Sequence, residues 1–290
     1  MGQYHRPCNL TTNEYLHPHD FGDGLKLLEF GESGQGTMSA LILLLAPGGR
    51  WHGDRIAIVG DYAEDADLPG EFMAGTIWER CTADEADWQQ VLDWRLPQAE
   101  EGKYGWDMER YEAMVAAPRY TNVSDIGVGQ LIHHGVVYST GQWGQIENER
   151  PGGAESWAPS DEVPMVIQNL TRRQYLRPEA FGDTPTLDRF IWAYGESVLC
   201  AFAVLLACAC KGGARGGGDF HGDQEGIVGS WASDQIAVIP AAQAVGMDVS
   251  LIVRGLMAQA ESSSQETDYI DHEDGTTTRI GWGGQKEQAA

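Results

Sequence analysis

One segment of this sequence, residues 211–229, gathers side chains that could bind a ligand: KGGARGGGDFHGDQEGIVG. Its glycine-rich backbone beside Arg215 could cradle an anion, because backbone N–H groups and a guanidinium both donate hydrogen bonds. Asp219, His221 and Asp223 supply the carboxylate and imidazole groups that metal ions prefer. The segment matches neither the G-x-x-x-x-G-K-S/T phosphate loop nor a G-x-G-x-x-G that opens a helix after a strand. We therefore expect a surface loop that holds no metal.

The chain carries nearly the same phrase twice, as NLTTNEYLHPHDFGD at 9–23 and NLTRRQYLRPEAFGD at 169–183. The match continues in the same order through a Gly-Glu-Ser triplet, an apolar segment and a Trp-led segment. These later matches pair 31–33 with 195–197, 37–49 with 198–213, 51–62 with 231–240, and 122–129 with 248–255. Chance rarely preserves order over so many segments, so the sequence predicts a tandem duplication.

Three carboxylates recur at matching positions of the two copies. The pairs are Asp23 with Asp183, Glu32 with Glu196, and Asp54 with Asp234. Paired acids can carry out general acid–base chemistry or hold a cation. However, each pair also stands where a turn or a helix start attracts an acid, and we favour that structural interpretation. In the alternative, Asp183 and Asp234 would line a ligand site together with the glycine-rich loop.

Other motifs argue against common metal and enzyme chemistry. His17, His19 and Asp20 have metal-ligand spacing, yet the second copy has RPEA at the matching positions, so the copies share no metal site. The sequence contains no G-x-S-x-G, H-E-x-x-H or paired C-x-x-C pattern. We therefore predict no catalytic residues, no metal and no cofactor, and a non-enzymatic protein is favoured.

Periodicity predicts alternating strands and helices in each copy. Strands are expected at 25–31, 55–62, 189–194 and 235–239, with a final strand at 136–140 or 278–282. Helices are expected at 37–46, 197–210 and 249–260, with two extra helices at 83–94 and 107–117. The predicted fold class is α/β, with α+β as the alternative, built from two β-α-β-α modules with approximate internal two-fold symmetry.

The copies and their insertions set the expected boundaries. The first module spans 1–149 and carries a helical insertion at 71–120, while the second spans 169–290 and carries the glycine-rich loop at 211–229. Residues 150–168 begin with Pro-Gly-Gly and are assigned to a linker.

Composition narrows the class of partner. The chain has 290 residues, with 19 basic and 43 acidic side chains and a formal charge of −24. Such a surface repels phosphate backbones, so direct nucleic-acid binding is not expected, although mimicry of nucleic-acid charge is a lesser alternative. The longest apolar run, 198–210, is shorter than the roughly 20 residues of a membrane span. We expect no membrane partner. The cysteines within this apolar run are interpreted as small core residues of a protein in the reducing cytoplasm.

A resemblance to a known group of proteins covers most of residues 9–62 and 169–240. It is based on the motifs NLT..YL.P..FGD, GTMSALILLLA, RGGGD and GSWA.D.I. They resemble a family of small acidic bacterial proteins, some of them phage-borne, that usually carry one copy. No activity is assigned to that family, so the resemblance implies no reaction, ligand or site. A phage-borne protein of this kind would belong to a virus-like particle instead of the free cytoplasm.

Together these features predict a non-enzymatic interaction or structural protein. Two fused copies of a self-associating module would present acidic faces to a protein partner or an assembly. The alternative is an enzyme or a small-ligand or anion binder that uses the loop at 211–223.

Overall fold

A computed structural model describes most of the chain. The described residues are 3–31, 36–82, 84–133, 163–183, 187, 198–208, 227–265, 269–271 and 277–279. In the following, residues 3–133 are called the first half, and the described residues from 163 onward the second half.

The first half contains a mixed four-stranded sheet with the strand order β3-β1-β2-β4. Strand β1 pairs antiparallel with β2 and β3, and β2 pairs parallel with β4. The strands are β1 (His5–Asn9), β2 (Glu14–Tyr15), β3 (Ile56–Gly60) and β4 (Thr121–Asn122). Every residue of β3 is buried, as its apolar sequence IAIVG requires.

The second half contains a sheet with the corresponding order β7-β5-β6-β8 and the same strand directions. Its strands are β5 (Met165–Asn169), β6 (Gln174–Leu176), β7 (Ile236–Pro240) and β8 (Met247–Asp248). The registers also correspond, since Glu14 faces Thr121 in the first sheet and Gln174 faces Met247 in the second. We use these registers to match positions between the halves.

The repeated Asn-Leu-Thr phrase closes the hairpin of each sheet. The side chain of Asn9 accepts hydrogen bonds from the backbone of Thr11 and Thr12, at 2.9 and 3.1 Å. Asn169 accepts in the same way from the backbone of Arg172 at 2.8 Å. These Asx turns replace backbone pairing where the chain reverses, which explains why Asn stands at the end of both first strands.

Two apolar helices occupy the centre of the molecule. They are α2 (Thr37–Leu45) and α8 (Val198–Leu206), and all of their residues are buried. Helix α2 contacts β7 of the other half, and α8 contacts β3. The short helix α1 (Leu27–Gly31) also packs against α8. One hydrophobic core therefore includes residues of both halves.

Backbone hydrogen bonds join the two halves in a reciprocal pattern. Gly53 donates to the carbonyl of Ile236 at 2.9 Å, and Ser233 donates to that of Ile56 at 2.8 Å. Ile56 in turn donates to Asp234 at 3.1 Å, and Ile236 donates to Asp54 at 2.9 Å. Gly53 matches Ser233, and Ile56 matches Ile236. Each hydrogen bond from one half to the other therefore has an equivalent bond in the reverse direction.

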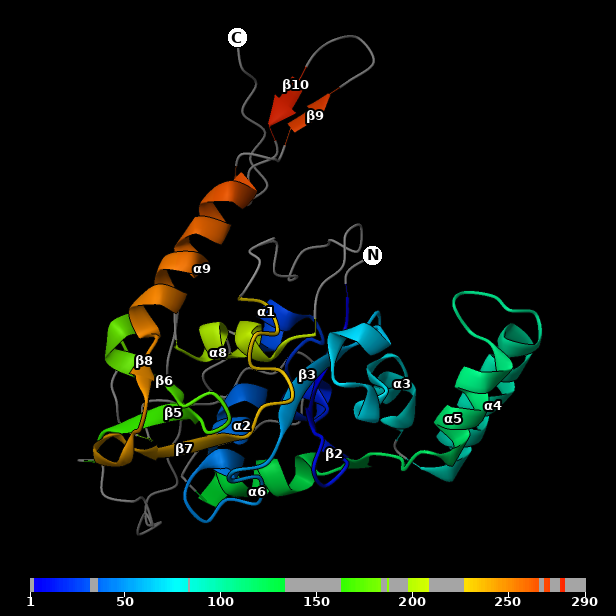
Figure 1. Cartoon of the computed structure of the whole chain (residues 1–290), viewed down its shortest axis with the longest axis horizontal. Helices are drawn as coiled ribbons and strands as arrows, with labels where there is room; N and C mark the ends of the chain where they lie inside the picture. Colours follow the sequence, from blue (N-terminus) through cyan, green and yellow to red (C-terminus); the bar gives the residue numbers. More distant parts are fainter. Residues whose placement is uncertain are drawn as a thin grey trace.

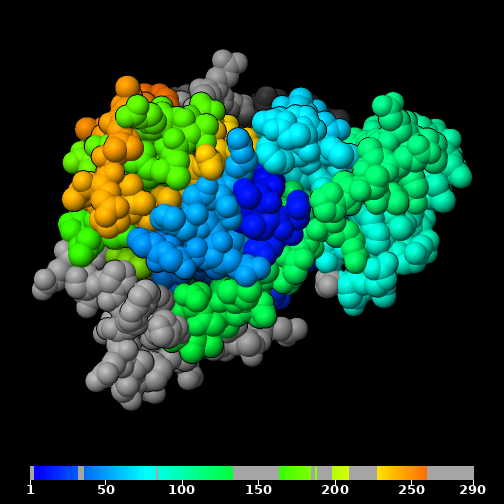
Figure 2. Space-filling view, turned by 60° about the horizontal axis from the view of Figure 1, so that its bottom comes forward, coloured from blue at the N-terminus to red at the C-terminus, as the bar shows by residue number. Residues whose placement is uncertain are grey.

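Residues 71–120 form helices that have no counterpart among the described residues of the second half. They are α3 (Ala74–Arg80), α4 (Glu85–Glu100) and α5 (Met108–Ala116). Helices α4 and α5 lie side by side, at the opposite side of Figure 1 from α9 (Ser250–Gln265). In Figure 2 they form a cyan and green lobe that projects from the rest of the molecule.

The remaining elements are short or flank the sheets. Helix α6 (Ser124–His133) follows β4 and packs on α2. The 3-10 turns are η1 (Pro18–Phe21), η2 (Asp65–Asp67), η3 (Gly70–Phe72), η4 (Pro178–Phe181) and η5 (Ala241–Gln243). Strands β9 (Tyr269–Asp271) and β10 (Thr277–Arg279) pair with each other beyond α9.

The described chain thus combines helices with two four-stranded sheets, which is consistent with the predicted α/β class and with its α+β alternative. The helices expected at 37–46, 83–94, 107–117 and 249–260 and the strands at 55–62 and 235–239 are confirmed, with shifted ends. The helix expected at 197–210 is confirmed over α8, and the final strand expected at 278–282 overlaps β10. The alternative strand at 136–140 and the strand at 189–194 lie outside the described residues. None of the described helices is long and apolar enough to span a membrane.

Two predictions were wrong. The segment predicted as a strand at 25–31 contains helix α1, which packs against α8. The predicted linker 150–168 extends too far, because Met165–Gln168 are buried residues of β5. The opening strand β1 was not predicted, since Arg6 and Pro7 interrupt its apolar pattern.

Candidate functional site

The repeated Asp23 and Asp183 bind the starts of the two central helices. Asp23 accepts hydrogen bonds from the backbone and hydroxyl of Thr37, at 2.7 and 2.8 Å. Asp183 accepts from the backbone of Val198 at 2.6 Å. Burial raises the pKa of Asp183, and the hydrogen bond from Val198 opposes that rise. These acids stabilise the free N–H groups and positive dipole at a helix start.

The repeated Asp54 and Asp234 hold the ends of the first strands. Asn9 donates to Asp54 at 2.8 Å, and Asn169 donates to Asp234 at 2.9 Å. Asp234 also forms an ion pair with Arg172 at 2.6 Å. Asp183 and Asp234 therefore have separate structural partners, and no hydrogen bond joins them among the described residues. This arrangement supports the structural interpretation of the repeated acids.

The remaining sequence candidates do not form a metal site in the described part of the chain. Arg215, Asp219, His221 and Asp223 lie outside the described residues, as do Glu32 and Glu196. The rings of His17 and His19 are 5.2 Å apart, and burial lowers the pKa of His17 to about 4. The described residues contain no group of three or more His, Cys, Asp or Glu side chains that could hold a metal ion.

The cysteines behave as the composition suggested, in the part that is described. Cys8, Cys81, Cys200 and Cys208 are buried thiols. The Cys8 and Cys81 sulfurs are 3.9 Å apart. Burial and its hydrogen bond with Cys81 raise the pKa of Cys8, which makes it a poor nucleophile.

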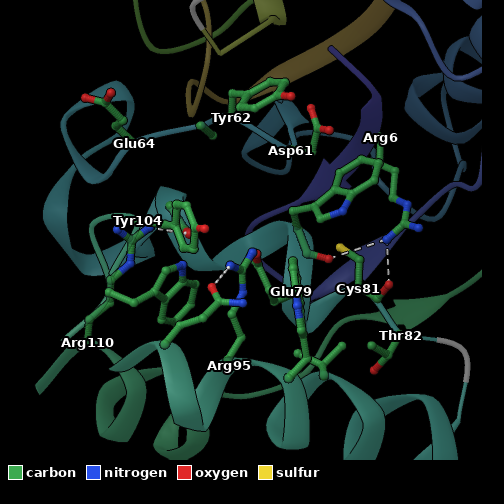
Figure 3. A pocket seen from close by; sticks show the side chains of 17 residues that line it. Arg6, Asp61, Tyr62, Glu64, Glu79, Cys81, Thr82, Arg95, Tyr104 and Arg110 are labelled. Atoms are coloured by element: carbon green, nitrogen blue, oxygen red, sulfur yellow. Dashed lines mark hydrogen bonds and ion pairs between the residues drawn. The ribbon is translucent and has the colours of Figure 1, made fainter. Parts of the chain in front are cut away.

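A pocket of about 780 Å³ opens where the helical insertion meets the first sheet (Figure 3). Its wall combines Arg6 of β1, residues that follow β3, and residues of α3, α4 and the turn before α5. Space of this size is typical of small-molecule sites. The three most exposed aromatic residues at the pocket are Tyr62, Trp94 and Tyr104, at 47%, 59% and 84%.

Guanidinium groups alternate with tryptophan rings along the pocket wall. Arg95 lies 4.0 Å from the Trp94 ring and 4.5 Å from the Trp106 ring, and Arg110 lies 4.6 Å from Trp106. Across the pocket, Arg6 lies 4.1 Å from the ring of Trp78. These cation–π contacts hold the cations in place and fasten the insertion to the sheet.

The arginines of the wall differ in how their charge is balanced. Arg95 forms an ion pair with Glu79. Arg6 instead donates to the carbonyls of Trp78 and Cys81, and Arg110 donates to two glycine carbonyls. Within the described chain neither Arg6 nor Arg110 has a carboxylate within ion-pair distance. Neither arginine therefore forms an ion pair at this wall, although Asp61 and Glu64 also line the pocket.

A second surface, the β8–α9 patch, consists of Val245, Met247, Leu251 and Ile252. These side chains are 50%, 59%, 69% and 57% exposed. They lie on and just before β8 and on the first turn of α9, which follow each other directly in Figure 1. Clustered exposed apolar side chains are unusual on a monomer and mark interaction surfaces.

Sequence reasoning missed both surfaces. The pocket joins residues far apart in the chain, and their spacing carries no motif. The patch had a readable signal at three of its four positions, because Val245, Met247 and Leu251 match polar residues of the first half, whereas Ile252 matches Ile126. No protein-family model, curated protein or solved structure matches the chain.

Proposed function

We propose that this chain is a non-enzymatic interaction protein made of two fused copies of one module, and that its β8–α9 patch binds a protein partner. The matching strand orders, registers and turns of the halves support the duplication. The reciprocal bonds of Gly53 with Ile236 and of Ser233 with Ile56 support descent from a symmetric dimer. In such a dimer the same surface of each subunit meets its own copy.

The use of the repeated acids supports a binding role over catalysis. Asp23, Asp54, Asp183 and Asp234 all accept structural hydrogen bonds. A catalytic acid or base must instead face a substrate, and these carboxylates are committed to helix starts and strand ends.

The observation that carries the partner proposal is a difference between matched positions. Val245, Met247 and Leu251 stand where the first half has Arg119, Thr121 and Asp125, and all six are exposed. Exposed leucine and methionine give no stability to the fold itself. Their gain in only one half favours a surface that is buried by another protein.

The partner chemistry follows from this patch and from the overall charge. An apolar face on the partner would cover the four side chains. A chain of net charge −24 would repel an acidic partner, so a neutral or basic protein is favoured.

A matched pair of baits tests this proposal. Wild-type chain, the Leu251→Ser/Ile252→Ser variant and an Asp125→Ser control would be used for affinity purification from the source cells, with quantitative mass spectrometry. We expect at least one protein to be retained by wild type and control and reduced about tenfold by the double variant, as for loss of an interface centre. Identical recovery by all three baits, together with an unchanged native mass, would exclude the patch as an interface.

A further inference from the structure

We propose that the pocket between the insertion and the first sheet binds a small molecule in which an oxyanion is attached to a planar ring. This site is separate from the β8–α9 patch and does not depend on the function proposed for it. It belongs to the first half alone, because the insertion has no described counterpart in the second half and Val166 occupies the position of Arg6.

The oxyanion part of the ligand is inferred from the guanidinium of Arg6, which forms no ion pair within the described chain. Both of its hydrogen bonds within the described chain come from Nη1, at 3.4 Å to Trp78 and 2.6 Å to Cys81. A guanidinium carries five N–H donors, so the Nη2 group retains donors for a ligand. Six other basic side chains of the described chain form ion pairs with carboxylates, whereas Arg55, Arg80 and Arg254, like Arg6, donate to backbone carbonyls. Arg6 differs from those three in lining the pocket. In a protein of charge −24, an unpaired arginine on a pocket wall therefore favours an anionic ligand.

Further polar groups around the pocket are unsatisfied within the protein. The Nε atoms of Arg6, Arg95 and Arg110 and the hydroxyl of Thr82 are buried and have no hydrogen-bond partner in the described structure. All four residues line this pocket. Buried donors without acceptors are costly, and an ordered water or ion is one way in which such groups are satisfied. In Figure 3, Arg6 and Thr82 lie on the opposite side of the view from Tyr104 and Arg110.

The planar part rests on the exposed aromatic residues at the pocket. Tyr104 is 84% exposed and Tyr62 is 47% exposed, so neither side chain is buried against its neighbours. Exposed aromatic rings beside fixed cations offer a stacking surface to a planar group whose charge reaches the arginines. The charge of the whole chain disfavours a nucleic-acid polymer but not a single small anion.

The ligand class is tested with four probes on the full chain. Adenosine monophosphate carries a ring and a phosphate, and indole-3-acetate carries a ring and a carboxylate. Adenosine lacks the anion, and inorganic phosphate lacks the ring. Calorimetry and the indole N–H signals of the tryptophans would report binding. We expect one of the two ring-bearing anions to bind at least about tenfold more tightly than adenosine and phosphate, as charged hydrogen bonds require. Which of them binds identifies the oxyanion as phosphate or carboxylate.

Variants tie the binding to the pocket. Arg6→Gln should weaken it about tenfold, because it removes the charge and keeps a donor. Tyr104→Ser should weaken it about fivefold without affecting folding, since this ring is largely exposed. Arg254→Gln on α9 is the charge control and should leave affinity unchanged, as should Leu251→Ser/Ile252→Ser. The proposal is overturned if neither ring-bearing anion binds at millimolar concentration, if adenosine binds equally well, or if folded Tyr104→Ser binds as wild type does.

Discussion

Trp51 donates its indole N–H to the carboxylate of Glu14 at 2.7 Å, and both side chains are buried. The matched Trp231 donates to the amide oxygen of Gln174 at 3.0 Å. One geometry is thus kept with a charged acceptor in one half and a neutral acceptor in the other. Burial would raise the pKa of Glu14, but hydrogen bonds from Arg50 and Trp51 lower it below its ordinary value.

This pairing predicts different costs for two substitutions of Glu14. Glu14→Gln should lower the free energy of unfolding by less than about 1 kcal/mol, because Gln keeps an acceptor for Trp51 and the half-exposed Arg50 contributes little. Glu14→Ala should cost about 2–3 kcal/mol, because the buried indole N–H loses its acceptor. Chemical denaturation of both variants measures the difference. Equal costs would contradict the role assigned to Trp51.

The turns that precede β3 and β7 each contain a residue with a left-handed backbone conformation. Gly53 has φ of 82° and the matched Ser233 has φ of 67°. A Cβ at Gly53 would meet only Leu170 at 3.7 Å, an ordinary contact, so the conformation is the whole obstacle to a side chain there. We expect Gly53→Ala to lower the free energy of unfolding by about 1 kcal/mol.

Two further variants complete this comparison. Ser233→Gly should not lower stability, because it removes the same strain from the second half. Gly70→Ala serves as the control, since its φ is ordinary and nothing lies within 4 Å of its added Cβ. The interpretation fails if chemical denaturation gives Gly53→Ala and Gly70→Ala the same free energy of unfolding.

His5 predicts a sensitivity to acid. It is fully buried in β1, and burial lowers its pKa to about 4, whereas an unfolded histidine titrates near 6.5. Between these values the unfolded chain binds more protons than the folded chain, so the stability is lost as pH falls from 6.5 to 4. The matched residue is Met165, which suggests His5→Met as the substitution without a titratable group.

The measurement compares unfolding free energies at pH 7 and pH 4.5. On acidification, wild type should lose about 2–3 kcal/mol more than His5→Met does. His19→Gln is the control, because the His19 side chain is exposed. Parallel pH profiles for wild type and His5→Met would show that His5 does not titrate in this range.

The sequence allowed prediction of elements whose pattern is local. Helix α2 is indicated by its apolar composition, helix α4 by the acidic residues at its start, and strand β3 by its β-branched residues. Strand β1 escaped prediction because both of its faces are covered and its sequence, HRPCN, contains neither an apolar run nor an alternating apolar pattern. Helix α1 was mistaken for a strand because five apolar-rich residues fit either period, and packing on α8 decided between them.

The candidate sites depended on information that spacing does not contain. Asp183 and Asp234 were recognised as repeated, but only the bonds to Val198 and Asn169 established their structural roles. The pocket requires Arg6 and the insertion to meet across the fold, which no local pattern encodes. The β8–α9 patch could have been read from the repeat by comparing Leu251 with Asp125.

The reciprocal contacts between the halves predict that the chain can be divided and reassembled. Fragments 1–155 and 156–290, cut within the predicted linker and expressed together, should purify as a one-to-one complex. The reason is that α2 and α8 each contact a strand of the other half and share one core. In the intact chain the contact between the halves is intramolecular, so the divided complex should dissociate on dilution whereas the intact chain should not.

A packing variant distinguishes this specific assembly from nonspecific adhesion. Gly31 lies where α1 meets α8, and an added Cβ would come within 3.3 Å of Ala203. Gly31→Leu should therefore force the helices apart and weaken co-purification of the fragments at least about tenfold, as overpacking of a tight contact does. Gly129→Leu on α6 is the matched control, because nothing lies within 4 Å of its Cβ position. Fragments that never associate, or that associate equally well with Gly31→Leu, would refute a specific interface between two fused copies.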